Sequence, residues 1–286
     1  MEGNIIFALD TNDRKTVLKY AQKIAEMRRI PDKHQATELA ELSKSMFAVK
    51  IGLLNIADCG LSIIKEVKQI TNMEIICDLK LADIPYIAGE VAKKAAEAGA
   101  DYLVVHSFIG EKPLNQVIEA VPHMKIILVS EMTHNNGCFT QRHLDEFAFM
   151  AKKMKVFGII GPGNRPDRIV RIKEIVGEDV KIIAAGVSIQ QGGEEKAALD
   201  AGANLLIKGR SIMEILDEQI DSTVFDFNWH KFKQNVLLKS VVTLFGGIVL
   251  YFGLKPLNLG NLIVSIVIAV YFIIFSIISQ HIIKRR

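Results

Sequence analysis

Eight short apolar runs recur along the first 220 residues, and a stretch of helical periodicity follows each of them. The runs are rich in Ile, Val, Leu and Ala, as expected for strands that are buried on both faces. We expect strands over residues 5–10, 47–52, 74–80, 101–107, 125–131, 156–161, 181–186 and 204–210. We expect helices over residues 13–27, 58–70, 86–98, 112–120, 140–153, 166–176, 194–201 and 211–220.

This regular alternation of strand and helix predicts an α/β fold with a parallel sheet. Eight units in 220 residues fit a (β/α)8 TIM barrel, which usually takes roughly 200 to 250 residues. The alternative is an open, doubly wound sheet. It is disfavoured because no G-x-G-x-x-G motif follows the first strand. Residues 28–45 interrupt the pattern as a polar insertion, with a helical piece near 37–43.

Charged residues gather where the first three strands end, which in a (β/α)8 barrel is where active sites lie. The first strand ends at Asp10 and the second carries Lys50, while the third carries Asp78 and Lys80 with Asp83 just beyond. Because side chains alternate along a strand, Asp78 and Lys80 share one face. Charges of both signs at one mouth predict a catalytic site. Later strand ends add the polar candidates His106, Ser107, Glu131, Thr133, His134 and Arg210.

Glycine-rich turns follow the seventh and eighth strands, a common place for a phosphate site in this fold. Glycines allow backbone N–H groups to approach an anion, and an arginine grips a phosphate with two hydrogen bonds. We therefore predict a phosphate site. The two turns read Gly186-Val187-Ser188-Ile189-Gln190-Gln191-Gly192-Gly193 and Gly209-Arg210-Ser211, in which the glycines and Arg210 are the candidate anion-binding residues.

The composition changes after Asp226, where long uncharged segments begin. Residues 236–254 contain one charge, Lys239, and residues 257–279 contain none. About 20 apolar residues span a bilayer. We therefore expect three parts: a barrel over 1–220, a basic linker over 221–235 and a two-helix transmembrane hairpin over 236–286. The alternative is a buried hairpin in a soluble protein.

Basic residues flank this hairpin at both ends, in the linker and at Lys284-Arg285-Arg286. Positive charge favours the cytoplasmic side, so both ends are expected there. The predicted location is the cell membrane, as a multi-pass protein whose barrel faces the cytoplasm. The net charge of +3 argues against a general polyanion binder, so we expect no nucleic acid partner. Three cysteines without a CxxC spacing give no reason to expect a disulfide scaffold or structural zinc.

Several of these motifs together resemble a known family. The third strand end, Asp78-Leu79-Lys80-Leu81-Ala82-Asp83-Ile84-Pro85, resembles the signature of orotidine 5′-phosphate decarboxylase, especially its archaeal branch. The resemblance covers about residues 4–215. Further matching motifs are Ala8-Leu9-Asp10, Val49-Lys50-Ile51-Gly52, Val105-His106-Ser107-Phe108, Glu131-Met132-Thr133-His134, Gly161-Pro162 with Arg165-Pro166, and Gly209-Arg210-Ser211.

The resemblance implies decarboxylation of orotidine 5′-phosphate to UMP and CO2, without a metal or organic cofactor. It implies that Lys80 donates a proton to C6 of the pyrimidine and that Asp78 lies beside the substrate carboxylate. Asp83 would contact the ribose in the other subunit of a homodimer, while Asp10 and Lys50 would bind ribose hydroxyls. By the same resemblance, Thr133 would contact the base, Gln190 or Gln191 would bridge base and phosphate, and Gly209 and Arg210 would hold the phosphate.

The sequence departs from the family at Ile87, where a hydroxyl residue is usual, and at Ala185, where proline is usual. The loop over 187–193 is one residue longer, and the insertion and the apolar tail have no counterpart. Two rival functions stay open. One is a magnesium-dependent aldolase resembling 3-hexulose-6-phosphate synthase. The other is a catalytically silent, membrane-tethered barrel that binds nucleotides.

Overall fold

A computed structural model describes residues 3–11, 13–29, 38–134, 139–188 and 192–218 of the 286-residue chain. The chain divides into two units, Met1–Asp221 and Ser222–Arg286, and the second lies outside the described residues. The predicted transmembrane hairpin therefore lies outside them as well. Within the described ranges, no helix combines the length and apolar character needed to cross a membrane.

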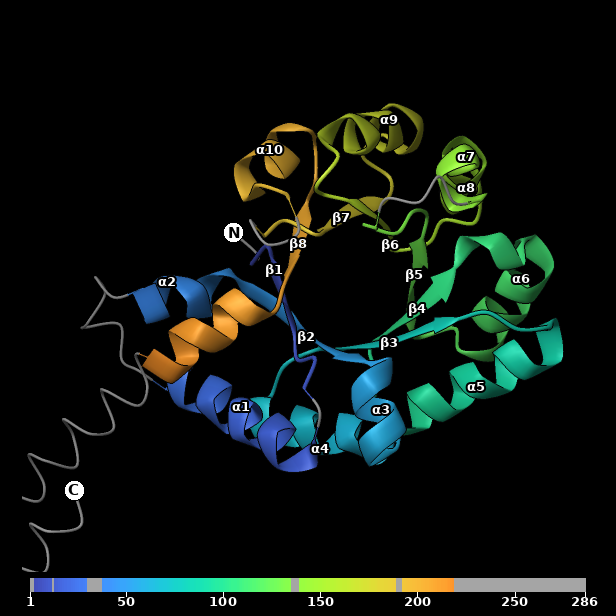
Figure 1. The fold of residues 1–286 in the computed structure, drawn as a ribbon. Coiled ribbons are helices and arrows are strands. Elements are labelled where there is room, and N and C mark those ends of the chain that lie inside the picture. The colour runs from blue at the N-terminus through green and yellow to red at the C-terminus, as the bar shows by residue number, and fades with distance from the viewer. Residues whose placement is uncertain (1–2, 12, 30–37, 135–138, 189–191, 219–286) are drawn as a thin grey trace, which may run out of the picture. The chain divides into compact units, whose positions relative to one another are not determined.

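Eight parallel strands close into a barrel in sequence order, with the helices around the outside (Figure 1). The first strand pairs with both the second and the eighth, which closes the ring. The TIM barrel predicted from the sequence is confirmed. The strands are β1 (Ile5–Ala8), β2 (Met46–Gly52), β3 (Ile75–Leu81), β4 (Tyr102–His106), β5 (Lys125–Val129), β6 (Gly158–Pro162), β7 (Lys181–Ala185) and β8 (Leu205–Lys208).

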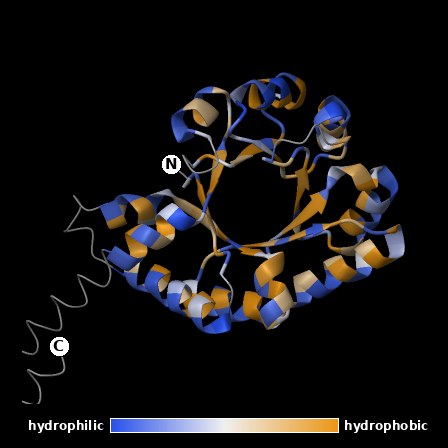
Figure 2. Cartoon of the chain, viewed as in Figure 1, coloured by the Kyte–Doolittle hydropathy of each residue, from blue (hydrophilic) through white to orange (hydrophobic). Residues whose placement is uncertain are grey.

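The described helices follow the predicted alternation closely. They are α1 (Arg14–Met27), α2 (Glu38–Ser45), α3 (Leu53–Cys59), α4 (Ser62–Thr71), α5 (Pro85–Glu97), α6 (Glu111–Ala120), α7 (Phe139–Arg142), α8 (Leu144–Lys153), α9 (Pro166–Val176) and α10 (Glu195–Asp200). A 3-10 turn, η2 (Ser107–Ile109), follows β4, and a further helix covers residues 210–218. Figure 2 shows mostly apolar residues on the strands and both apolar and polar residues on the surrounding helices.

Several sequence predictions about element boundaries were wrong, including the first strand, which ends at Ala8 and not at Asp10, and the fifth, which ends at Val129 and not at residue 131. The helix expected over 58–70 begins only at Ser62, as α4, because the unpredicted helix α3 occupies residues up to Cys59 and Gly60 ends it with a positive φ of 73°. The helix expected over 140–153 is divided, with α7 ending at Arg142 and α8 beginning at Leu144. The eighth strand ends at Lys208 and not at Arg210, which is already helical.

The core has two layers, one between the sheet and the helices and one inside the barrel. The inner layer is built from alternate strand residues such as Ile6, Ala48 and Ile76. Aromatic rings close its N-terminal end, where Tyr102 and Phe157 meet edge to face at 4.9 Å. Following the same alternation toward the C-terminal ends of the strands places Asp10, Lys50 and Asp78 at the opposite end of the barrel.

The helix over 210–218 is held against α1 by one carboxylate near its end. Asp217 accepts hydrogen bonds from the Tyr20 hydroxyl at 2.8 Å and from the Lys23 ammonium at 2.8 Å, and it also pairs with Lys19. Burial alone would raise the pKa of Asp217, but these donors lower it to about 2. The contacts fix the element that begins with Arg210.

Candidate active site

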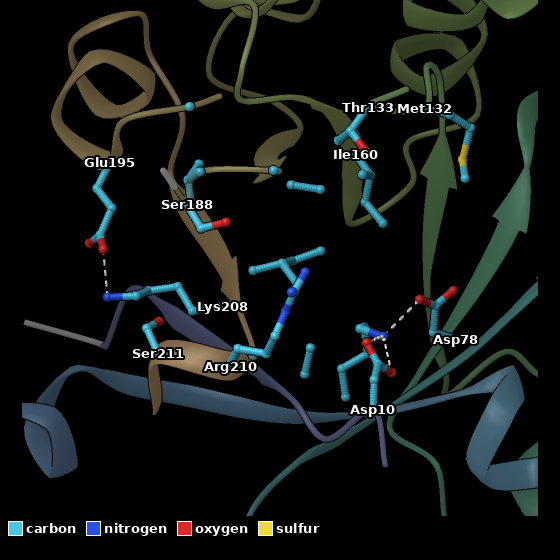
Figure 3. Close-up of a pocket in the computed structure, with 18 of the residues that line it drawn as sticks. Asp10, Asp78, Met132, Thr133, Ile160, Ser188, Glu195, Lys208, Arg210 and Ser211 are labelled. Carbon is cyan, nitrogen blue, oxygen red and sulfur yellow. Dashed lines mark hydrogen bonds and ion pairs between the residues drawn. The ribbon is translucent and has the colours of Figure 1, made fainter. Parts of the chain in front are cut away.

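A cavity of about 940 Å³ opens at the C-terminal ends of the strands (Figure 3). It is lined by residues from β1, β2, β3 and from the loops after β5, β7 and β8. The predicted site residues at its wall are Asp10, Lys50, Asp78, Lys80, Thr133, Gly186, Gly193, Gly209 and Arg210. Gly192 and Asp83 are described but are not part of the wall, and Gln190 and Gln191 lie outside the described residues.

Four charged side chains, from β2, β3 and the turn after β1, form a continuous array at one side of the cavity. The Lys50 ammonium lies 3.1 Å from Asp10 and 3.1 Å from Asp78. Lys80 lies 2.8 Å from the same Asp78 carboxylate. The order Asp10–Lys50–Asp78–Lys80 alternates in sign and sums to zero charge, so each buried charge has an opposite neighbour.

The array differs in exposure from its centre to its ends. The side chains of Asp78 and Lys50 are 3% and 7% exposed, whereas those of Lys80 and Asp10 are 37% and 51% exposed. Burial by itself would neutralise the two central groups. For Asp78, the nearby charges of Lys50 and Lys80 outweigh the effect of burial, so its pKa is lowered. For Lys50, the charges of Asp78 and Asp10 outweigh the effect of burial, so its pKa is raised. The central pair is therefore ionised, and Lys80 presents its ammonium to the cavity.

Lys80 is held in an unusual backbone conformation. Its φ is +46°, in the left-handed region that side-chain-bearing residues rarely adopt. The pairing of β3 with β4 shifts register between Cys77 and Leu81, so Lys80 sits on a bulge. Bulges re-aim side chains next to active sites. In this conformation the Lys80 ammonium lies on the same side as Asp78, 2.8 Å from its carboxylate.

Two further residues make room for the array and support it from behind. A Cβ added at Gly52 would lie 2.6 Å from the Asp10 carboxylate, so a larger residue there would displace this carboxylate from the array. Asn55 is fully buried, accepts a hydrogen bond from the Gly52 amide at 3.2 Å and donates one to the Thr11 carbonyl at 3.1 Å. It joins the ends of β1 and β2. Sequence reasoning missed Asn55, since a single asparagine near a helix start carries no distinct signal.

The loop after β5 is fixed by residues that follow β6. Asn164 donates to the Thr133 carbonyl at 3.1 Å, and Arg165 donates to the Met132 carbonyl at 2.6 Å. Thr133 in turn packs against Gly186, where an added Cβ would lie 2.7 Å from the threonine methyl. Thr133 is thus held beside the start of the loop that follows β7.

Glu131 has a structural role that its place at a strand end did not reveal. It is buried and pairs with Arg165 at 3.0 Å and Arg168 at 2.8 Å. A carboxylate between two guanidinium groups is well suited to bracing the loop after β5. Although Glu131 touches the cavity, its charge is balanced by these arginines.

The other polar candidates from the sequence, His106, Ser107 and His134, are not part of the cavity wall. His106 stacks on Phe108 with ring centroids 4.6 Å apart, and Ser107 is buried beneath the mouth. Burial lowers the pKa of His106, and Lys80 acts in the same direction, which favours a neutral ring. Burial also raises the pKa of Cys77 to about 12, so this thiol is unreactive. Among the described residues, no group of three or more His, Cys, Asp or Glu side chains is arranged to hold a metal.

The loop after β7 and the turn before the helix over 210–218 both line the cavity, and their residues Ser188 and Arg210 lie on the side away from Asp78 (Figure 3). Gly186 and Gly192 have φ values of +77° and +74°, so both turns of the loop after β7 depend on glycine. Gly209 precedes the helix over 210–218, and its carbonyl accepts the amides of Ile212 and Met213. Arg210 is exposed at the first turn of that helix and points into the cavity (Figure 3). A cation at a helix N-terminus suits a bound anion.

Comparison with known proteins gives consistent matches. Residues 3–219 match the model of the orotidine 5′-phosphate decarboxylase/HUMPS family. The chain is 42% identical to orotidine 5′-phosphate decarboxylase of Pyrococcus abyssi over 63% of this chain and 86% of the relative. It is 40% identical to that of Pyrococcus furiosus over 73% and 89%.

Solved structures show the same similarity. Orotidine 5′-phosphate decarboxylase of Pyrococcus horikoshii matches with a TM-score of 0.60 and 35% identity, over 72% of this chain and 89% of that one. The enzyme of Methanocaldococcus jannaschii, solved with the inhibitor BMP, matches with a TM-score of 0.63 and 32% identity, over 75% and 92%.

Proposed function

The chain belongs to the orotidine 5′-phosphate decarboxylase/HUMPS family and is an orotidine 5′-phosphate decarboxylase, and from this premise we propose how its residues act. Its reaction converts orotidine 5′-phosphate to UMP and CO2. The observation that carries the proposal is the Asp10–Lys50–Asp78–Lys80 array at the cavity wall, with Lys80 2.8 Å from Asp78. In this proposal Lys80 is the proton donor.

The chemistry requires a fixed cation beside C6 of the pyrimidine. The bond from C6 to the carboxylate carbon breaks, CO2 leaves, and the electron pair stays on C6. A positioned ammonium stabilises that charge as it develops and then supplies the proton. Lys80 is suited to this because Asp78 holds it from the buried side while its other face meets the cavity. Lys50 and Asp10 complete the array and bind ribose hydroxyls.

The opposite side of the cavity binds the phosphate and the base. Arg210 and the Gly209 amide grip the phosphate, together with the glycine turns at Gly186, Gly192 and Gly193. Thr133 contacts the base, supported by its position between Asn164 and Gly186. Gln190 or Gln191 bridges base and phosphate. This interaction falls outside the described residues and rests on the sequence alone.

The active unit is proposed to be a homodimer. Asp83 is exposed and absent from the wall of its own cavity, and its carboxylate accepts the Ile84 amide at 2.7 Å. Large apolar side chains are exposed on the neighbouring turns after β2, β3 and β4: Leu53 by 59%, Ile84 by 63%, Tyr86 by 70% and Phe108 by 46%. Such a patch is typical of a protein interface. A second copy covering it would bring Asp83 to the partner's ribose site.

The C-terminal part is proposed to anchor the enzyme in the cell membrane, with the barrel over 1–220 facing the cytoplasm. Support comes from the uncharged segments 236–254 and 257–279 and from the basic flanks in 221–235 and 284–286. The two segments would cross the bilayer as a hairpin.

One assay tests the proposed function against its rivals. Purified full-length protein is mixed with orotidine 5′-phosphate, and the loss of its absorbance is followed with and without EDTA. We expect UMP to form at the same rate in both. An aldol activity on phosphosugars that EDTA abolishes would instead support the magnesium-dependent rival. Tight UMP binding without turnover would support the silent barrel.

A further inference from the structure

A lysine and a glutamate from different elements meet at the rim of the cavity. Lys208 is the last residue of β8 and Glu195 is the first of α10. Their Nζ and Oε1 atoms are 2.6 Å apart, and both residues belong to the cavity wall (Figure 3). The Lys208 side chain is only 15% exposed, whereas that of Glu195 is 46% exposed. A largely desolvated ammonium is therefore held by a carboxylate from another segment.

This ion pair joins the two segments that form the proposed phosphate site. Lys208 directly precedes Gly209 and Arg210, and Glu195 follows Gly193 by two residues. The loop after β7 is closed at its base, because the Gly193 amide donates to the Ser188 carbonyl at 3.1 Å. A Cβ added at Gly193 would lie 2.1 Å from the Gly186 carbonyl oxygen. A displacement of Glu195 is therefore transmitted to the base of this loop.

We propose that the Lys208–Glu195 pair is a positioning device that aligns the loop after β7 with the Gly209–Arg210 turn, so that both contact the same phosphate. The inference rests on the proposed function, because that function supplies the phosphate. Lys208 reaches toward Glu195, whereas Arg210 points into the cavity (Figure 3). Lys208 thus acts through the loop, and Arg210 is the cation that meets the ligand.

The two possible roles of Lys208 predict opposite results. If Lys208 positions the loop, substituting either Lys208 or Glu195 breaks the same ion pair. The losses of phosphate binding from the two substitutions are then not additive. If Lys208 binds phosphate directly, Glu195→Gln frees its charge and strengthens phosphate binding. The sign of the Glu195→Gln effect separates a positioning residue from a phosphate ligand.

The test is binding of UMP, the reaction product, and of uridine, its phosphate-free form, to the full-length protein. The variants are Lys208→Met, Glu195→Gln, both together, and the exchange Lys208→Glu with Glu195→Lys. Each single variant should weaken UMP binding about five- to tenfold, as expected for coupled neighbours. Uridine binding should stay the same. The double variant should be no weaker than either single one, and the exchanged pair should recover much of the loss.

The matched control is Lys173→Met with Glu178→Gln, an ion pair of 2.7 Å at the far end of α9. It should leave UMP binding unchanged. Additive losses, an equal loss for uridine, or tighter UMP binding by Glu195→Gln would overturn the positioning role. UMP binding that none of the variants changes would overturn it too and leave the proposed function standing. Absence of UMP binding by the unaltered protein would overturn both.

Discussion

Asp78 is buried to 3% exposure, and Lys80, two residues along the same strand, meets its carboxylate at 2.8 Å while remaining 37% exposed to the cavity. The Asp78 carboxylate also receives Lys50 at 3.1 Å. One buried acid thus holds two lysines, the buried Lys50 and the cavity-facing Lys80. The consequences of removing Asp78 follow from this arrangement.

Asp78→Asn should lower the free energy of unfolding at pH 7 by about 3 kcal/mol, because it leaves Lys50 buried with a single, half-exposed partner. The pKa of Asp78 lies below its usual 3.8, since its two lysines outweigh burial. Its contribution is therefore fully present above pH 3.8 and is lost as the pH falls through the lowered value. Urea unfolding at several pH values should show the difference between native and variant protein shrinking in acid.

A matched control for this measurement is Asp145→Asn, whose partner Arg171 is exposed. It should cost less than about 1 kcal/mol, the usual scale of a surface ion pair. Equal stability of Asp78→Asn and native protein at pH 7, or a difference that grows in acid, would contradict the account of the array.

Arg210→Ala should lower kcat/KM for orotidine 5′-phosphate by a factor that corresponds to about 2 to 3 kcal/mol, which is the scale of losing a charge-assisted contact. The phosphate-free nucleoside orotidine should be affected much less, because it lacks the group that Arg210 binds. The measurement is kcat/KM for both substrates, with the exposed helix residue Arg171→Ala as the control. Equal losses for both substrates would show that Arg210 does not grip the phosphate.

The proposed dimer predicts recovery of activity on mixing two inactive variants. Lys80→Ala lacks the proton donor and Asp83→Ala lacks the residue offered to the partner. A mixed dimer contains one site of two with both residues intact, so each mixed dimer should regain up to about half of native activity. After random exchange of equal amounts about half of the dimers are mixed, so the whole sample should regain up to about a quarter. Exchange is verified independently with differently tagged chains. Proven exchange without recovery would mean that each site is complete within one chain.

The C-terminal proposal predicts that the barrel functions alone. A chain ending after about Asp226 should be soluble and active, because every proposed catalytic residue precedes that point. The full-length chain should stay with membranes after carbonate washing, and its C-terminus should be shielded from labels applied outside intact cells. Release of the full-length chain by carbonate, or outside labelling of its C-terminus, would defeat the hairpin topology.

The strands and the charged array could be predicted because local sequence determines both. An apolar run long enough for one strand was followed each time by a helical pattern, and alternation placed Asp78 and Lys80 on one face. The helix end at Gly60 was missed, because a glycine that ends a helix and a glycine that lies inside one look alike in the local sequence.

Residues that act through tertiary contacts could not be found in this way. Asn55 matters because it bridges Gly52 and Thr11, and Lys208 because it meets Glu195. Neither pairing has a sequence spacing that would signal it. Glu131 was predicted as a mouth residue, but its buried pairing with Arg165 and Arg168 needed the structure.

The most direct test of the central claim is the turnover of orotidine 5′-phosphate by Lys80→Ala, beside native protein and Lys93→Ala, an exposed lysine on α5. Loss of the proton donor and of the stabilising cation should lower kcat by at least about a thousandfold, while UMP still binds and the barrel stays folded. Lys93→Ala should match the native rate. A kcat for Lys80→Ala near the native value would contradict the assignment of Lys80 as the group that protonates C6.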